Sequence, residues 1–232
     1  MNTIFYPALA AHVASGILAI FFGLIPIVTA KGGRRHRAAG HWYKRAMYGV
    51  LGSAALLTLL AWKPYFAALT IGAAISTFSG IRVLKRKRPD LDPGQRAQPL
   101  DWSFMLLATT LLLALLLSAL AGEVGHNATV FYALLGGAGA YLLWDFWRFI
   151  FPTAWPFFPD LWFYEHLVKM LASLSAVVSA FSGSVLHFLP IAEPWKQLWS
   201  TILFHNLMIA MIVWYAFLRK RVKGSRGQRA AG

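Results

Sequence analysis

The basic residues of this chain are clustered, and the clusters alternate with long apolar runs. The sequence of 232 residues contains 22 Lys and Arg residues, and only Lys63, Lys169 and Lys196 lie outside four short segments. The four segments hold Lys31, Arg34, Arg35, Arg37, Lys44 and Arg45; Arg82, Lys85, Arg86, Lys87, Arg88 and Arg96; Arg148; and Arg219, Lys220, Arg221, Lys223, Arg226 and Arg229. Because Lys and Arg are enriched in the cytoplasmic loops of membrane proteins, each segment predicts a position on the cytoplasmic side.

The apolar runs are long enough to cross a bilayer, since about 20 apolar residues in a helix span its hydrocarbon core. We expect about seven spans, at residues 5–29, 46–62, 65–83, 102–121, 129–149, 165–187 and 197–218. The sequence therefore predicts an all-α fold, a polytopic transmembrane bundle of about seven helices with the N-terminus outside and the C-terminus in the cytoplasm. Residues 1–218 are expected to form a single transmembrane helical domain, and residues 219–232 a basic cytoplasmic tail.

The composition agrees with a membrane location. The chain is 58% hydrophobic and 13% charged, with a mean hydropathy of +0.57, which leaves too little polar surface for a soluble domain of this size. The formal charge of +14 lies beside the predicted spans, so we expect contact with the anionic headgroups of membrane lipids and no nucleic-acid binding. We expect a multi-pass protein of the bacterial inner membrane that keeps its first helix. A homo-oligomer and a membrane-complex partner are both compatible with the sequence.

The chain has no Cys, so disulfides and thiolate metal sites are excluded and membrane-embedded chemistry depends on histidines. His12 and His205 lie at nearly the same depth, roughly 10–12 Å below the outer surface at a rise of 1.5 Å per residue. His187 ends a predicted span on that side. Near the inner face, His41 lies in the first basic loop and His166 opens the sixth predicted span.

Matched depth is what axial ligation of haem by two imidazoles requires. His12 with His205 meets this condition, and His41 with His166 forms a second candidate haem site near the inner face. The leading hypothesis is therefore a histidine-ligated b-type haem or redox protein. An alternative is a membrane hydrolase in which His12, His187 and His205 bind a zinc ion that activates water. Another alternative is a non-enzymatic transporter or a subunit of a membrane complex.

The same histidines also have simpler structural interpretations. A neutral imidazole in a bundle can hydrogen-bond a backbone carbonyl or a Ser, which would explain His12 and His205 without a cofactor. His36 and His41 are compatible with exposed loop positions. His166 stands among charged residues at the predicted inner boundary, which indicates an interfacial polar network. These charged residues are Asp145, Arg148, Glu165 and Lys169.

Two further patterns bear on packing. Small residues recur every four positions, at Gly72, Ser76 and Gly80 and again at Ala172, Ala176 and Ala180. Such residues let helix backbones approach closely in lipid, so both stripes predict packing faces. Residues 144–164 are rich in aromatic side chains and contain Pro152, Pro156 and Pro159, so they cannot form one continuous helix. Their rings predict either an aromatic belt at headgroup level or a platform beside a flat cofactor or lipid head.

The first span and the loop after it carry a recurring pattern. Its residues are His12, Gly16, Gly23, Lys31-Gly32, His36-Arg37, Gly40, Tyr43 and Met47, with weaker similarity at Asp101-Trp102 and at His166 with Met170. The pattern resembles a widespread, functionally uncharacterised family of small bacterial polytopic membrane proteins. The resemblance implies a multi-pass membrane fold and no particular activity.

Overall fold

The computed structural model describes residues 2–122, 128–186, 209–211 and 213–214. These residues form helices and turns and no strand, so the all-α prediction is confirmed for them. The helices are α1 (Asn2–Val28), α2 (Arg34–Leu60), α3 (Pro64–Arg82), α4 (Pro99–Leu120), α5 (Ala128–Ile150) and α6 (Leu161–Leu186), with short 3-10 helices η1 (Val83–Lys85) and η2 (Pro93–Gln95) between α3 and α4.

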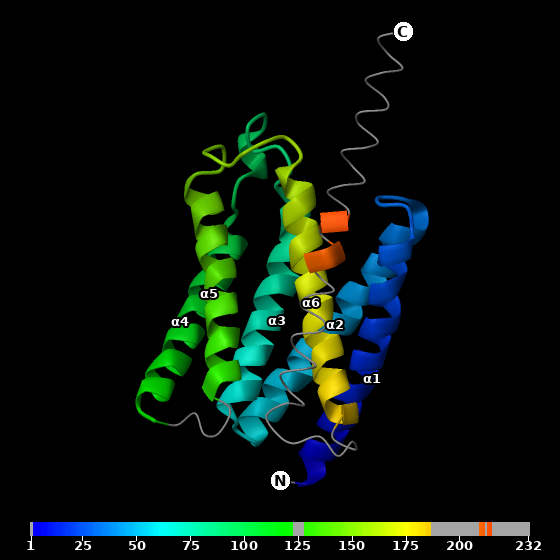
Figure 1. Ribbon diagram of the computed structural model, residues 1–232, viewed down its shortest axis with the longest axis vertical. Helices are drawn as coiled ribbons and strands as arrows, with labels where there is room; N and C mark the ends of the chain where they lie inside the picture. Colours follow the sequence, from blue (N-terminus) through cyan, green and yellow to red (C-terminus); the bar gives the residue numbers. More distant parts are fainter. Residues whose placement is uncertain (1, 123–127, 187–208, 212, 215–232) are drawn as a thin grey trace.

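Successive helices run in opposite directions, so alternate connections gather at the same end (Figure 1). Residues 29–33, 83–98 and 151–160, which join α1 to α2, α3 to α4 and α5 to α6, all lie at the end drawn uppermost. We call this the basic end, because it includes the basic residues that follow α3 and the arginine near the end of α5. α3 lies at the centre and packs against α2, α4, α5 and α6, while α1 and α2 form a hairpin beside them.

Four stretches are long and apolar enough to cross a membrane, as expected of an integral membrane protein. They are Thr3–Val28, Pro64–Lys85, Pro93–Leu120 and Leu161–Ser182. α2 and α5 are not among them, since α2 begins with basic residues and α5 contains Asp145 and Arg148. The count of about seven spans and the orientation stay predictions, and the predicted span at 197–218 lies almost entirely outside the described residues.

One predicted boundary is wrong by about three turns of helix. The first basic segment was expected to be a loop as far as Arg45, yet α2 begins at Arg34. Lys and Arg are good helix formers, and their long side chains can carry the charge away from an apolar surface. As a consequence His41 lies on a helix, and His166 lies in the second turn of α6 rather than at its start.

The core has one part on each side of the α3–α6 contact. Ile75, Met105 and Leu142 join α3, α4 and α5, whereas Ala19, Met47 and Leu174 join α1, α2 and α6. The small-residue stripe on α3 is a packing face, as predicted: Gly72 lies near Ala138 of α5, and Gly80 lies against α6. A Cβ atom added to Gly80 would lie 3.0 Å from Lys169 Cβ and 3.0 Å from Met170 Sδ.

A candidate ionic site at the basic end of the bundle

Asp101, in the first turn of α4, is held by two arginines from the segment that ends α3. Arg82 donates from Nε and Nη2 to the two carboxylate oxygens of Asp101, at 2.7 and 2.8 Å. The backbone N–H of Gln98 donates to the same carboxylate at 2.9 Å, and Arg86 Nη1 lies 3.6 Å from it. Because Asp101 is only 1% exposed, protein groups must replace the water that a carboxylate normally binds.

Two more ion pairs join α5 to α6. Lys169 Nζ contacts Asp145 Oδ1, and the two side chains are 2% and 1% exposed. Arg148 Nε lies 3.5 Å from Glu165 Oε1, and Trp144 Nε1 donates to that oxygen at 2.7 Å. The four charged residues near His166 therefore pair with one another, while their position at a membrane interface stays a prediction.

Arg86 links these ion pairs. Its guanidinium interacts electrostatically with Asp101, Asp145 and Glu165, and burial lowers its pKa by more than the three carboxylates raise it. The guanidinium lies over the ring of Phe149, 4.4 Å from the ring centroid, a favourable cation–π geometry. Its Nη1 has no hydrogen-bond acceptor among the described residues. Its nearest carboxylate oxygen is that of Asp101, at 3.6 Å, longer than a good N–H···O hydrogen bond.

We call the seven residues Arg82, Arg86, Asp101, Asp145, Arg148, Glu165 and Lys169 the ionic cluster. Its four cations outnumber its three carboxylates by one. This excess of positive charge in a partly buried place attracts anions.

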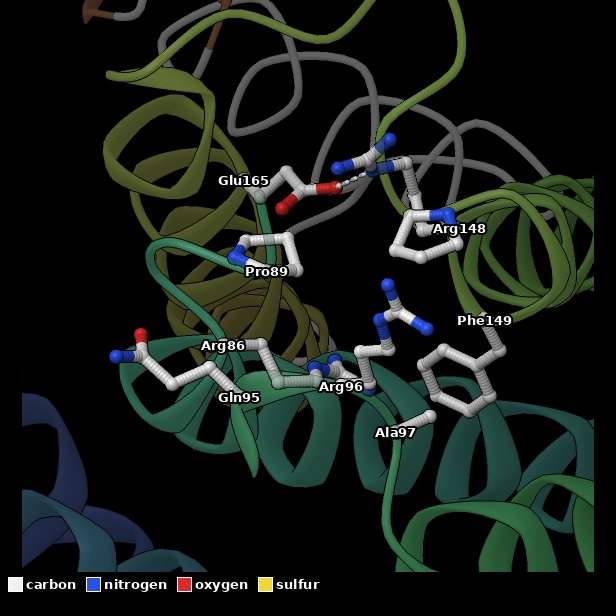
Figure 2. A pocket seen from close by; sticks show the side chains of 9 residues that line it. Arg86, Pro89, Gln95, Arg96, Ala97, Arg148, Phe149 and Glu165 are labelled. Carbon is white, nitrogen blue, oxygen red and sulfur yellow. Dashed lines mark ion pairs between the residues drawn. The ribbon is translucent and has the colours of Figure 1, made fainter. Parts of the chain in front are cut away.

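A pocket opens beside the ionic cluster (Figure 2). It is lined by Arg86, Pro89, Gln95, Arg96, Ala97, Arg148, Phe149, Pro152 and Glu165. The pocket has a volume of about 20 Å³, which is room for about one water molecule, and it is open to solvent. Three arginines and one glutamate give the lining a positive charge.

The polar face of α6 continues from the ionic cluster toward the middle of the bundle. Ser173 follows Lys169 by one turn, and its Oγ lies 2.7 Å from both Tyr43 Oη and Thr77 Oγ1. All three hydroxyl side chains are 3% exposed or less. Since Glu165, Lys169 and Ser173 are spaced by four residues, they lie on one face of α6.

A second cavity lies between α3, α5 and α6, toward the opposite end of the bundle. Its volume is about 100 Å³, and its lining includes residues of both small-residue stripes. Those stripes were predicted as packing faces, and they also leave space where they meet α5. Gly72, Ser76, Ala172, Ala176 and Ala180 contribute to this lining.

The outer histidine prediction can be followed only at His12. Its Nδ1 lies 3.1 Å from Ser53 Oγ and 3.3 Å from the Val50 carbonyl oxygen. These two neighbours satisfy Nδ1 without a cofactor, as the simpler interpretation of His12 expects. His187 and His205 lie outside the described residues, so both the outer haem pair and the zinc triad stay predictions.

The inner histidines have separate surroundings. His41 is exposed on α2, whereas His166 donates its Nδ1–H to the Gly80 carbonyl oxygen at 2.8 Å. The histidine that interacts electrostatically with His166 is His36, whose Nδ1 lies 3.3 Å from the Pro26 carbonyl oxygen. The pairing of His41 with His166 at a haem stays a prediction.

Within the described part of the chain, no group of three or more His, Cys, Asp or Glu side chains is placed to hold a metal ion. No protein-family model, curated protein or solved structure matches this chain. The resemblance at residues 12–47 therefore stays a prediction, and the functional argument rests on the chain's own geometry.

Sequence reasoning missed the arginine half of the ionic cluster. Arg82 and Arg86 were interpreted only as orientation signals in a basic loop, although Asp101 opens a predicted span. An acid in the first turn of an apolar span is a signal, because an unpaired carboxylate there is expensive. The Asp101 carboxylate therefore predicts a cationic partner at the end of a neighbouring helix.

Proposed function

We propose that this chain is a non-enzymatic membrane carrier in which α3, α5 and α6 surround the path of a small polar solute. The observation that carries this proposal is the buried ion pair of Asp145 and Lys169 between α5 and α6. Buried ion pairs add little stability, since apolar residues of similar volume often serve as well or better. Ionisable residues inside membrane helices instead mark pathways for ions and substrates.

The surroundings of the ion pair support a path. On one side, Glu165, Lys169 and Ser173 lead inward from the basic end, and the hydroxyls of Thr77 and Tyr43 extend this polar row. On the other side lies the cavity of about 100 Å³. The Asp145–Lys169 pair lies on the same α5 and α6 helices that line the cavity.

Asp145 has a free acceptor for a proton or for a donor on a solute. Its Oδ1 contacts Lys169, while its Oδ2 is buried without a hydrogen-bond partner among the described residues. A buried oxygen that accepts no hydrogen bond costs free energy, and a bound donor recovers that free energy. This is the behaviour expected of a binding site between two access routes.

Uptake by reconstituted vesicles tests the proposal. We would load proteoliposomes with a pH-sensitive dye and measure uptake of radiolabelled phosphate, a monocarboxylate and a neutral amino acid. At least one solute, or protons, should cross faster than in protein-free vesicles, and Asp90→Asn at an exposed ion pair should leave that rate unchanged. Rates equal to those of protein-free vesicles for every solute and for protons would contradict a carrier.

A histidine-ligated haem is a second candidate, and the hydrogen bond of His166 favours it. His166 donates from Nδ1 to the Gly80 carbonyl oxygen, which leaves Nε2 available, and metal-bound histidines commonly have this arrangement. Purified protein should then show a Soret band that shifts on reduction. The band should vanish in His12→Ala or His205→Ala and persist in His126→Ala. A colourless protein from haem-supplied cells would exclude this candidate.

A further inference from the structure

We infer that the pocket formed by Arg86, Arg96 and Arg148 binds a phosphate-type oxyanion at the basic end of the bundle. That the carried solute is such an anion rests on the proposed function, whereas anion binding itself requires only the pocket. The shared chemistry is a tetrahedral, multiply charged oxyanion. Its source is either a soluble phosphate compound or the headgroup of a membrane lipid.

The charge of the pocket favours an anion. Three guanidinium groups face it and only one carboxylate, that of Glu165. Glu165 Oε1 already accepts from Trp144 Nε1 and lies 3.5 Å from Arg148 Nε, so its charge is largely offset. Arg96 is exposed, and no ion pair holds it within the described residues.

Two of the arginines that line the pocket are incompletely hydrogen-bonded by the protein. Arg86 Nη1 and Arg148 Nε are buried without a hydrogen-bond partner in the described part of the chain. Their ion pairs, at 3.6 and 3.5 Å, are longer than good N–H···O hydrogen bonds. The Arg148 side chain is 9% exposed, so water satisfies it poorly. Phosphate oxygens are the acceptors that guanidinium groups bind best, often through two parallel hydrogen bonds.

The pocket is also held in shape before any ligand arrives. Arg86 lies over Phe149, and Arg148 lies over Phe157 with 5.5 Å between its Cζ and the ring centroid. The loop that carries Arg96 is closed by a hydrogen bond from Arg88 N to Gln95 Oε1 at 2.9 Å. Preorganised donors lose little entropy on binding, which raises affinity.

The position of the pocket suits both sources of the anion. It opens at the basic end, which the sequence predicts to be cytoplasmic, and basic pockets between membrane helices on that side bind phosphorylated headgroups. The pocket has a volume of about 20 Å³, room for about one water-sized group, and it is open to solvent. A phosphate can therefore place one oxygen among the guanidinium groups while the others stay in water.

The test measures binding, not transport. Calorimetry on full-length, delipidated protein in detergent would use inorganic phosphate as the probe. Arg96→Gln removes a charge without breaking a described ion pair and should weaken phosphate binding at least about tenfold. Arg34→Gln, an exposed arginine at the start of α2, is the matched control and should leave binding unchanged. Arg148→Lys keeps the charge but loses the two parallel N–H groups of the guanidinium, so it should weaken phosphate binding as well.

A second arm separates the two sources. Protein in nanodiscs of phosphatidylglycerol and phosphatidylcholine would be extracted, and the retained lipid counted by native mass spectrometry. If retention of phosphatidylglycerol falls in Arg96→Gln but not in Arg34→Gln, the anion is a lipid headgroup. If phosphate binding falls in Arg96→Gln but not in Arg34→Gln, the anion is a soluble phosphate compound. Equal behaviour of the two variants in both arms, or no binding in either, overturns the inference. Arg96-dependent binding without uptake by proteoliposomes supports the pocket and contradicts the carrier.

Discussion

At the scale of single residues, the chain concentrates its buried charge in a few matched groups. Asp101, Asp145 and Lys169 are each 2% exposed or less, and each has a partner of opposite charge. Removing one partner from such a pair leaves the other charged and unsolvated, which costs more than the pair contributes. The buried members should therefore be far more sensitive to substitution than the exposed charges around them.

Asp101→Asn tests this sensitivity. Asn keeps one acceptor but loses the charge that Arg82 meets with two hydrogen bonds, so we expect destabilisation near the lower end of about 3–5 kcal/mol. The measurement is the midpoint of unfolding in mixed detergent micelles. Asp90→Asn, at the exposed pair with Arg88, should change the midpoint little. Equal shifts in the two variants would contradict this view of the cluster.

His36 predicts a pH dependence of stability. Burial lowers its pKa below the ordinary value of 6.5, and Lys31 lowers it further, although the Pro26 carbonyl raises it. The unfolded chain therefore binds a proton more readily than the folded one, so stability is complete above about pH 6.5 and falls as the pH drops below it. The unfolding midpoint should decrease when the pH is lowered from about 7.5 to about 5.5, and it should decrease less in His36→Gln. Identical pH profiles of the two proteins would contradict this prediction.

The ionic cluster was only partly predictable from the sequence. Asp145, Arg148, Glu165 and Lys169 were predicted to form an interfacial polar network, because charges near a membrane boundary need partners. Which charge meets which depends on how α5 and α6 both pack against α3, and no local pattern encodes that. Arg86 was harder still, since its three carboxylate neighbours come from α4, α5 and α6.

At the scale of helices, the apolar runs predicted the elements well. The described helices end within a few residues of the expected spans because apolar length and prolines are local signals. α2 is the exception, as its first turns are basic and were assigned to a loop. Local composition distinguishes membrane from water better than helix from loop, because Lys and Arg are compatible with both.

The contact between α3 and α6 gives a prediction at this scale. A methyl group at Gly80 would meet Lys169 Cβ and Met170 Sδ at 3.0 Å, so Gly80→Ala should push the helices apart and cost about 1–3 kcal/mol. Gly52→Ala is the control, since a Cβ there meets nothing within 4 Å and should add about 0.5–1 kcal/mol of helix stability. Unfolding midpoints measure both. A stabilising Gly80→Ala would show that this contact is loose.

At the scale of the whole molecule, three connections meet at one end of the bundle. The basic residues after α3 and near the end of α5 lie there together, although they are far apart in sequence. The side of a membrane that this end faces stays a prediction, and it can be measured.

Reporter fusions test the orientation. Fusions at Gly33, Pro93 and Gly232 should report the cytoplasm, and fusions at Glu123 and Glu193 the outside, because basic segments are retained on the cytoplasmic side. Substituting Arg82, Arg86 and Arg88, which precede Gly94, should weaken the preference of this segment for the cytoplasm. A cytoplasmic Glu123 would contradict the predicted span at 102–121 and with it the orientation of the ionic cluster.

If the proposed function holds, the buried Asp145–Lys169 pair serves passage of the solute and not folding. The most direct measurement compares unfolding midpoint and solute uptake in the double variant Asp145→Leu/Lys169→Leu. Because apolar replacements of buried ion pairs are often neutral or stabilising by about 1–4 kcal/mol, the double variant should unfold at the same midpoint or a higher one, while the uptake seen with the original chain is lost. A double variant that folds equally well and still takes up the solute at the original rate would contradict the claim.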